Sequence, residues 1–284
     1  MKNFDLEEIK RVWTPAVGDK IAERDVWDRN SVTYRDRPMP TPENDMSMKC
    51  LADHQMLTED SVVLDVGCGG GLYSVPIARQ CKHLVGTDVS PEMLKTAAYN
   101  TERYGVHNTE FHLIDWHSFV LPEDWNRRFD LVFANLTPAV QSYHTLDLMN
   151  RASKKWCFLS KPVEWKNSLV YEVVDKLGLT RQYRTFDEDM LFAFNVLRLE
   201  GYTPHTCYKR MTWHSSGSLE KTILDISDRI EMKVCLNEAQ KKRIPEKEIY
   251  RQIPVPPVSS PRRPSPSARR YAAPRRRSTH SRSF

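Results

Sequence analysis

One short segment brings together an acidic residue and several glycines early in the chain. Asp65 is followed by glycines at three alternate positions, Gly67, Gly69 and Gly71. The apolar run around Asp65, residues 62–66, predicts a buried parallel strand. Alternating glycines let the main chain turn tightly and bring its N–H groups against a ligand, where a side chain would collide. A helix predicted over 72–80 directs its N-terminus at the same space, so the segment predicts a nucleotide-type cofactor site.

The spacing of these residues distinguishes two classes of cofactor. A dinucleotide fingerprint requires the pattern G-x-G-x-x-G/A, but Leu72 occupies its last position and the acid precedes the first glycine. The segment instead resembles motif I of class I S-adenosylmethionine-dependent methyltransferases. A carboxylate suits that cofactor, because its methionine end carries an ammonium group beside a sulfonium, whereas a dinucleotide presents an anionic pyrophosphate. A nicotinamide-dependent oxidoreductase is therefore a disfavoured alternative.

A second predicted strand, 83–88, ends in another acid. Asp88 lies 23 positions after Asp65, close to the separation expected for a carboxylate that accepts hydrogen bonds from ribose hydroxyls. Ser90 is followed by a proline and an acid, a pattern typical of a helix start. The resemblance implies that this helix start packs on the cofactor, which places Met93 in contact with it.

Two further strands are predicted at 111–115 and 129–135. The resemblance implies that Asp115 accepts from the adenine amino group, that Trp116 packs on the adenine ring, and that Asn135 lies at the motif IV position beside the cofactor. A single strand-terminal acid is often only a helix cap. Four strand ends in the right order agree with one another, and they predict an α/β fold: a doubly wound, Rossmann-like class I methyltransferase sheet with helices on both faces.

The remaining elements follow from hydrophobic periodicity and from turn residues. Helices are predicted at 44–57, 141–152, 164–177, 187–199 and 218–234, and strands at 155–160 and 206–213. No apolar segment after residue 240 suits the last antiparallel strand of this fold, so that strand is doubtful. The predicted organisation is an N-terminal helix and connector over 1–43, a methyltransferase domain over 44–250 with a substrate lid at about 180–215, and a tail over 251–284.

The N-terminal region adds one more resemblance. Trp27-Asp28 and Tyr34 resemble the W-D…Y segment that precedes this domain in many small-molecule methyltransferases, where it folds over the cofactor. Simple packing of the two aromatic rings on the edge of the domain explains these residues equally well.

No motif identifies a catalytic base. Methyl transfer is an in-line displacement, and a base is needed only if the acceptor is protonated at neutral pH. The side chains near the predicted strand ends that could serve are His144, Tyr143 and His117. A structural or solvent-facing role suits each of them as well.

Composition favours a cytoplasmic protein without membrane spans. Hydrophobic residues make up 40% of the 284, enough for a sizeable core, but no stretch approaches the about 20 apolar residues of a membrane span, and the N-terminus lacks a secretory signal. The six cysteines show no C-x-x-C pair, so we expect reduced thiols and no metal cluster.

The net positive charge of the chain comes from its C-terminal tail. Residues 251–284 hold nine arginines and no acid, which leaves residues 1–250 with a net charge of −4. The tail is too poor in apolar residues to fold. It is interpreted as an RNA- or membrane-binding arm, as a segment with no specific role, or as the product of translation in a shifted frame, which would explain the abrupt change from lysine to arginine.

These features together predict a methyltransferase that uses S-adenosylmethionine and acts on a small metabolite. The chain resembles the branch that includes quinone-biosynthesis methylases. Its segment 135–138 lacks the Asn/Asp-Pro-Pro-aromatic form of many amino-methylases of nucleic acids and proteins, and the acidic body offers no surface for nucleic acid. The alternatives are an RNA or protein methyltransferase guided by the basic tail, and a non-catalytic protein that binds the same cofactor.

Overall fold

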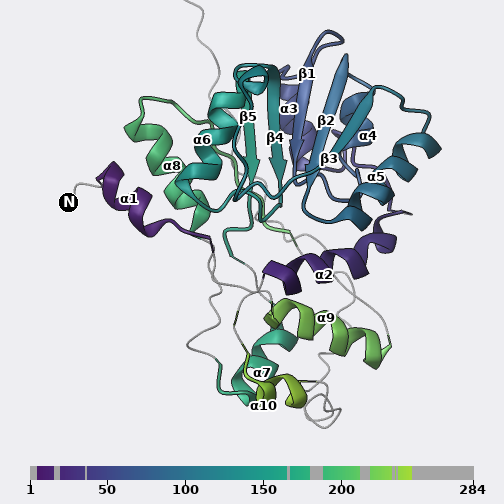
Figure 1. Cartoon of the computed structure of the whole chain (residues 1–284), viewed down its shortest axis with the longest axis vertical. Coiled ribbons are helices and arrows are strands. Elements are labelled where there is room, and N and C mark those ends of the chain that lie inside the picture. The colour runs from purple at the N-terminus through teal and green to yellow at the C-terminus, as the bar shows by residue number, and fades with distance from the viewer. Residues whose placement is uncertain are drawn as a thin grey trace, which may run out of the picture.

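A parallel sheet forms the centre of the molecule (Figure 1). The computed structural model describes residues 5–15, 20–35, 37–164, 167–179, 188–211, 218–231, 234 and 236–244. Within these residues five strands pair in the order β3-β2-β1-β4-β5. Their bounds are β1 Val62–Val66, β2 His83–Asp88, β3 Thr109–Leu113, β4 Phe129–Asn135 and β5 Ser153–Ser160. The predicted Rossmann-like α/β fold is confirmed. All neighbouring strands are parallel, and the order of the strands along the chain reverses between β1 and β4, which is where open α/β sheets bind ligands.

The apolar runs of the central strands are buried on both faces. Leu64 and Val132 point into one core, whereas Val63 and Leu131 point into the other. All four side chains are fully buried. This two-sided burial is the reason that apolar residues of β1 and β4 stand next to one another in the sequence instead of alternating with polar residues.

Helices cover both faces of the sheet. The helical segments are α1 Leu6–Val12, α2 Lys20–Asn30, the 3-10 turn η1 Ser31–Tyr34, α3 Met46–Asp53, α4 Ser74–Ala78, α5 Pro91–Arg103, the 3-10 turn η2 Glu123–Trp125, α6 Tyr143–Ala152, α7 Ser168–Lys176, α8 Asp189–Leu199, α9 Leu219–Glu231 and α10 Glu238–Arg243. Helices α6, α8 and α1 contribute to the core on one face, and α3 and α4 to the core on the other.

Local signals set the helix boundaries. The Ser90 side chain accepts a hydrogen bond from the Met93 N–H, and a proline occupies the first turn of α5, as predicted. Helix α7 begins at Ser168, four residues later than the predicted start, and it ends before Gly178, which has φ +70°.

A second, smaller core lies apart from the sheet. Apolar side chains of α7, α9 and α10, among them Val173, Ile226 and Ile244, form a separate buried cluster. Figure 1 shows these helices beyond the carboxyl ends of the strands, with α2 between them and the sheet. Arg29 of α2 forms an ion pair with the buried Asp228 of α9, with 2.7 Å between Nη2 and Oδ1. The pair connects the two parts, because a carboxylate with so little exposure needs a partner.

The predicted sixth strand is wrong over the residues that can be compared. Residues 206–211 form no strand, and Tyr208 and Met211 in this segment are exposed. Alternating polarity stabilises a strand only where a neighbouring strand offers a ladder of hydrogen bonds, and this segment instead runs beside α3, where the His205 and His54 rings lie 4.6 Å apart. Strand β3 also ends at Leu113, two residues earlier than predicted. The tail 251–284 and its interpretations lie outside the described residues.

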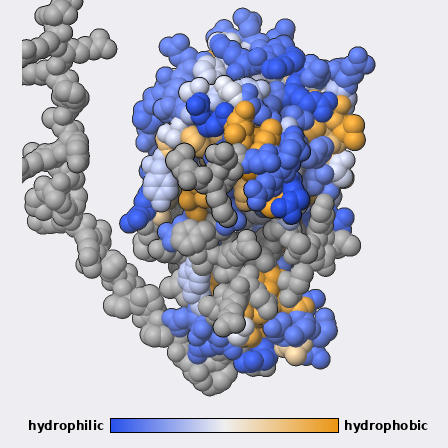
Figure 2. Space-filling model, turned by 90° about the vertical axis from the view of Figure 1, so that its left-hand side faces the viewer, coloured by the Kyte–Doolittle hydropathy of each residue, from blue (hydrophilic) through white to orange (hydrophobic). Residues whose placement is uncertain are grey.

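Apolar side chains reach the surface on the side of the molecule that carries α1 and α8 (Figure 2). The large exposed residues of these two helices are Val12, Leu191, Phe194 and Leu199. In the part of the chain that the structure describes, no helix has the length and apolar character required to cross a bilayer.

Candidate functional site

Three glycines shape the loop between β1 and α4, and they do so for different reasons. Gly67, Gly69 and Gly71 have φ of +65°, +54° and +75°, in the left-handed region that disfavours other residues. A Cβ at Gly67 would lie 1.9 Å from Thr137 Oγ1, and one at Gly71 would lie 3.1 Å from the Ala97 Cα. Beside Gly69 the nearest atom is the Met93 Sδ at 4.0 Å. The loop therefore packs on protein at Gly67 and Gly71, and it leaves room for further atoms beside Gly69.

Asp88 holds this loop in place. One carboxylate oxygen accepts from the Gly69 N–H at 2.8 Å, and the other accepts from the Ser90 N–H at 2.9 Å. Burial raises the pKa of Asp88, against the lowering effect of these backbone hydrogen bonds. Each oxygen retains a second lone pair, so the side chain can fix the loop and still accept hydrogen bonds from a ligand.

Asp65 lies buried at the centre of the sheet. Its Oδ2 accepts from the Ser74 hydroxyl at 2.6 Å, and the residue is 2% exposed. Burial raises the pKa of Asp65 to about 7; the Ser74 hydrogen bond lowers it, and the charge of Asp88 raises it further. A nearby cation would favour the ionised form, so this carboxyl suits a positively charged ligand.

The raised pKa makes stability depend on pH in a defined direction. Because the folded pKa lies above the unfolded value, Asp65 stabilises the protein below about pH 4, and this contribution is lost as the pH rises through 7. In the wild type, Asp65 should lower the unfolding free energy by at most about 3 kcal/mol between pH 5 and pH 8, and we expect this decrease to be absent in Asp65→Asn. Urea unfolding at both pH values measures this, with the exposed Asp53→Asn as control. Equal slopes for wild type and Asp65→Asn would show that Asp65 does not titrate as inferred.

Met93 lies beside the glycine loop, and its contact with the cofactor stays a prediction, whereas the two residues assigned to adenine make other contacts in the structure. Met93 is 1% exposed beside Gly69. Asp115 accepts from the His117 N–H at 3.0 Å and caps the turn after β3. Trp116 is 2% exposed, donates from Nε1 to the Thr145 carbonyl at 3.2 Å and stacks on Phe119. Their contacts with adenine stay predictions.

The carboxyl end of β4 leaves a polar donor without a partner. The Asn135 Oδ1 accepts from the Ser47 hydroxyl at 2.8 Å, but its Nδ2 is buried and makes no hydrogen bond to a described residue. The next residue, Leu136, has φ +51°, an uncommon conformation for a branched apolar residue. A buried donor without a partner at this edge suits an acceptor atom on a ligand.

The N-terminal segment lies over the glycine loop. Ser90 donates from its hydroxyl to the Asp28 carboxylate, and the Asn100 amide bridges the carbonyls of Tyr34 and Gly70 at 3.1 and 2.7 Å. A Cβ at Gly70 would lie 2.6 Å from the Tyr34 Cβ. The W-D…Y segment therefore packs on the loop and on the start of α5, and its contact with the cofactor stays a prediction.

The structure gives each of the three candidate bases a different hydrogen-bond partner. Tyr143 donates to the Glu200 carboxylate at 2.9 Å, and burial together with Glu200 raises its pKa. The His144 Nε2 lies 3.3 Å from the Phe119 carbonyl. His117 lies in the turn that Asp115 caps. The hydrogen bonds described here do not join these side chains to the glycine loop, and a catalytic role for any of them stays a prediction.

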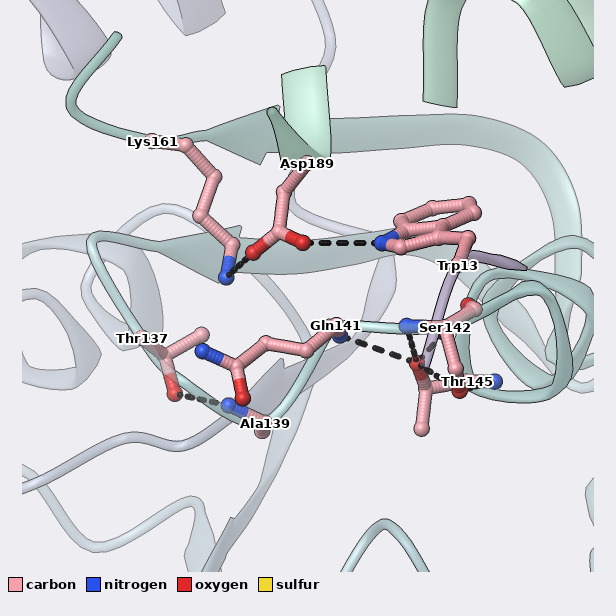
Figure 3. A network of polar contacts seen from close by, with 8 residues as sticks. All are labelled: Trp13, Thr137, Ala139, Gln141, Ser142, Thr145, Lys161 and Asp189. Atoms are coloured by element: carbon pink, nitrogen blue, oxygen red, sulfur yellow. Dashed lines mark hydrogen bonds and ion pairs between the residues drawn. The ribbon is translucent and has the colours of Figure 1, made fainter. Parts of the chain in front are cut away.

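Sequence reasoning missed a buried ion pair at the carboxyl end of β5 (Figure 3). The Lys161 Nζ lies 2.9 Å from the Asp189 Oδ2, and the Asp189 Oδ1 accepts from the Trp13 Nε1 at 2.8 Å. The Lys161 and Asp189 side chains are 3% and 13% exposed. Figure 3 also shows Thr137 and Gln141 on the loop after β4, on the same side of the sheet. Only the lysine directly after a predicted strand could have been a signal, because Asp189 lies 28 positions from it and Trp13, which donates to Asp189, lies 148 positions from it.

Comparison with known proteins supports the interpretation of the glycine loop. Residues 57–178 match the family model described as "Methyltransferase domain". The chain is 37% identical over 75 residues to a 23S rRNA (uracil(1939)-C(5))-methyltransferase of Hahella chejuensis, which covers 25% of this chain and 17% of that protein. It is 34% identical over 135 residues to a release factor glutamine methyltransferase of Cereibacter sphaeroides, which covers 46% of this chain and 45% of that protein.

The similarity does not extend over whole proteins. This chain spans less than half the length of either of these two relatives. A solved structure of a SAM-dependent methyltransferase from Aquifex aeolicus is 22% identical, covers 58% of this chain and 78% of that chain, and has a TM-score of 0.36. Residues 57–178, which match the family model, contain the glycine loop and all five strands of the sheet described above.

Proposed function

We propose that this chain, in which residues 57–178 form a class I S-adenosylmethionine-dependent methyltransferase domain, transfers a methyl group to a small metabolite. The observation that carries the proposal is the conformation of the loop at Gly69. Asp88 accepts a hydrogen bond from the Gly69 N–H, and a Cβ at Gly69 would meet only the Met93 Sδ within 4 Å, at 4.0 Å. A backbone held in this way offers N–H groups to a ligand without a side chain in between.

The residues at the carboxyl edge of the sheet fit the cofactor. Asp88 retains lone pairs for two ribose hydroxyls, and Asp65 supplies a carboxyl that a cation would keep ionised. Met93 offers an apolar contact beside the loop, and the unpartnered Asn135 amide offers a donor. When bound, S-adenosylmethionine supplies a methyl group that its sulfonium already activates.

The chain must position the methyl acceptor at the same edge. Rate enhancement then comes mainly from orientation, which can lower the barrier by several kcal/mol, about 7–11 in well-oriented cases. The loop after β4 and Lys161 after β5 lie beside one another at this edge. The Lys161 ammonium is paired with Asp189, whose other oxygen accepts from Trp13, and an ammonium held in this way is a suitable donor to an oxygen of the acceptor.

A small acceptor is favoured by charge and by motif IV. Residues 1–250 carry a net charge of −4, which disfavours a polyanionic substrate. Segment 135–138 lacks the Asn/Asp-Pro-Pro-aromatic form. Within this class we favour the branch that resembles quinone-biosynthesis methylases.

An RNA or protein substrate is the second candidate, because both relatives named above modify macromolecules. One is named as a 23S rRNA methyltransferase and the other as a release factor glutamine methyltransferase. The nine arginines of the tail would be the electrostatic contact with RNA in this case.

Incubation with methyl-labelled S-adenosylmethionine distinguishes these candidates. The protein is mixed with total cell extract that has been separated into small molecules, RNA and protein, and the label is followed into each fraction. We expect label in the small-molecule fraction, and little transfer by Asp88→Ala, which loses the carboxylate that fixes Gly69. Label in RNA or protein that disappears when residues 253–284 are removed would favour the second candidate. Cofactor binding by calorimetry without label in any fraction would favour a non-catalytic binding protein.

A further inference from the structure

Arginine side chains lie over tyrosine rings on a surface that η1 and α5 share. The Arg37 Cζ lies 3.9 Å from the centroid of the Tyr34 ring, and the Arg35 Cζ lies 5.1 Å from the centroid of the Tyr99 ring. Tyr34 ends η1, and Tyr99 lies on α5, which packs against η1. Both distances fall within the about 6 Å over which a cation and an aromatic ring attract one another.

The same arrangement continues past the end of α5. Arg103 donates to the Arg35 carbonyl at 3.3 Å, and its Cζ lies 5.8 Å from the centroid of the Tyr104 ring. The Arg79 Cζ, at the end of α4, lies 5.6 Å from the same centroid, and Arg79 donates to the Tyr104 carbonyl at 2.9 Å. We call these four arginines and three tyrosines the arginine–tyrosine surface.

Three guanidinium groups of this surface carry a charge that no described carboxylate neutralises. Within the part of the chain that the structure describes, Arg35, Arg37 and Arg79 form no ion pair. Arg37 and Arg79 are exposed, and each donates to a main-chain carbonyl. The Arg35 Nε is buried and makes no hydrogen bond to a described residue. Because a guanidinium has five N–H groups in a planar fork, these side chains retain donors for the paired oxygens of an anionic group.

Acidic residues beside the surface leave it positively charged. On α5, Glu92 pairs with Lys95 at 2.6 Å, and the Glu102 Oε2 lies 3.8 Å from the His107 Nδ1. Asp36 lies outside the described residues and offsets at most one of the four arginine charges. The net charge of −4 over residues 1–250 predicted no surface for nucleic acid. That value averages over the whole body, so it conceals a local excess of positive charge.

We propose that the arginine–tyrosine surface binds single-stranded RNA. Guanidinium groups bind phosphate oxygens in pairs, and unpaired bases stack on aromatic rings and on guanidinium planes. Tyr99 is 45% exposed, which leaves its ring accessible to a base. A duplex presents phosphates but keeps its bases stacked, whereas RNA exposes unpaired bases in loops and bulges. Rings beside the guanidinium groups therefore favour single-stranded RNA over a duplex or an acidic protein.

The surface adjoins the cofactor loop. Tyr34 packs on this loop, since a Cβ at Gly70 would lie 2.6 Å from the Tyr34 Cβ. RNA on the surface therefore lies beside the proposed cofactor site. The inference holds for either methyl acceptor considered above, because RNA binding is measured without methyl transfer.

Fluorescence anisotropy with a short labelled oligouridylate tests the surface. The full-length chain is compared with the triple variant Arg35→Gln/Arg37→Gln/Arg79→Gln at several salt concentrations. Each phosphate contact with a single strand contributes about 0.7 to the slope of log affinity against log salt concentration. We expect the triple variant to reduce the slope by about 2 and to bind at least about 10-fold more weakly at low salt. Circular dichroism checks the fold of each variant.

A control variant removes the same charge elsewhere. Lys49→Gln/Arg151→Gln/Lys241→Gln removes the cations of three surface ion pairs. It should keep the slope and weaken binding by less than about threefold. The nine arginines of residues 251–284 are present in all three proteins, so their contribution cancels. Equal losses in the two triple variants would overturn the proposal, because they would reflect net charge alone.

Photocrosslinking locates the RNA without any substitution. The wild-type chain is irradiated with an oligouridylate that contains 4-thiouridine, and mass spectrometry identifies the crosslinked peptides. We expect crosslinks at Tyr34 or Tyr99. Crosslinks confined to residues 251–284, or no binding of oligouridylate, would overturn the proposal. Tighter binding of oligothymidylate would overturn it in favour of DNA. Binding to phosphatidylserine vesicles that the arginine variant loses, with no change in oligouridylate binding, would overturn it in favour of a membrane.

Discussion

We expect Gly69→Val to reduce the affinity for S-adenosylhomocysteine by at least about 1,000-fold, which is about 4 kcal/mol. A Cβ at this position meets no protein atom closer than the Met93 Sδ at 4.0 Å, so the new side chain occupies the open space in front of the loop, where the cofactor is proposed to lie. Isothermal titration calorimetry on the purified variant measures the loss.

Backbone strain must be separated from this steric block. Gly69 has φ +54°, so valine also destabilises the fold by about 1–2 kcal/mol. Gly105→Val is the matched control, because Gly105 has φ +64° and a Cβ there meets nothing within 4 Å. It should unfold at a similarly lowered urea concentration and bind the cofactor normally. If Gly69→Val bound within tenfold of wild type, the loop would not approach the ligand.

Lys161→Met should destabilise the protein by about 3–5 kcal/mol, because it removes the ammonium that lies 2.9 Å from the largely buried Asp189 carboxylate. The ion pair joins side chains that are only 3% and 13% exposed. The same carboxylate accepts from Trp13, so its rearrangement would disturb the contact of the N-terminal segment with α8. Urea unfolding at pH 7 gives the free energy.

A double variant and a surface pair provide the comparison. Lys161→Met with Asp189→Asn removes both charges and keeps a carbonyl oxygen for the Trp13 N–H, so most of the lost stability should return. Lys49→Met breaks an ion pair of the same 2.9 Å length between side chains that are 61% and 54% exposed, and should change stability by less than about 1 kcal/mol. A change just as small for Lys161→Met would mean that water replaces the lost cation.

Local patterns in the sequence were sufficient for the central part of the fold. The apolar run of β1, the glycines at 67, 69 and 71, and the capping residue Ser90 are each defined within a few neighbours. A strand that is buried on both faces appears in the sequence as a run of apolar residues, and the first turn of a helix appears as a capping residue such as Ser90. The sheet and the cofactor loop were therefore predictable.

Patterns failed where a partner in space decides the outcome. Alternation over 206–213 predicted a strand, but the described part of that segment runs beside α3. A strand needs another strand to complete its hydrogen bonds, and alternation carries no information about whether one is available. The contacts of Trp116 with Phe119 and with the Thr145 carbonyl were likewise not indicated by the sequence, and its predicted contact with adenine stays untested.

The sequence by itself determined that a Rossmann-like sheet carries a glycine loop between two acids, because short-range spacing encodes strands, turns and caps. Only the tertiary structure decided which glycine faces open space, that Asp88 holds the Gly69 N–H, and that Lys161 pairs with Asp189 and through it with Trp13. These last contacts join residues up to 176 positions apart. Long-range packing selects such partners by shape and charge, and no local spacing records that selection.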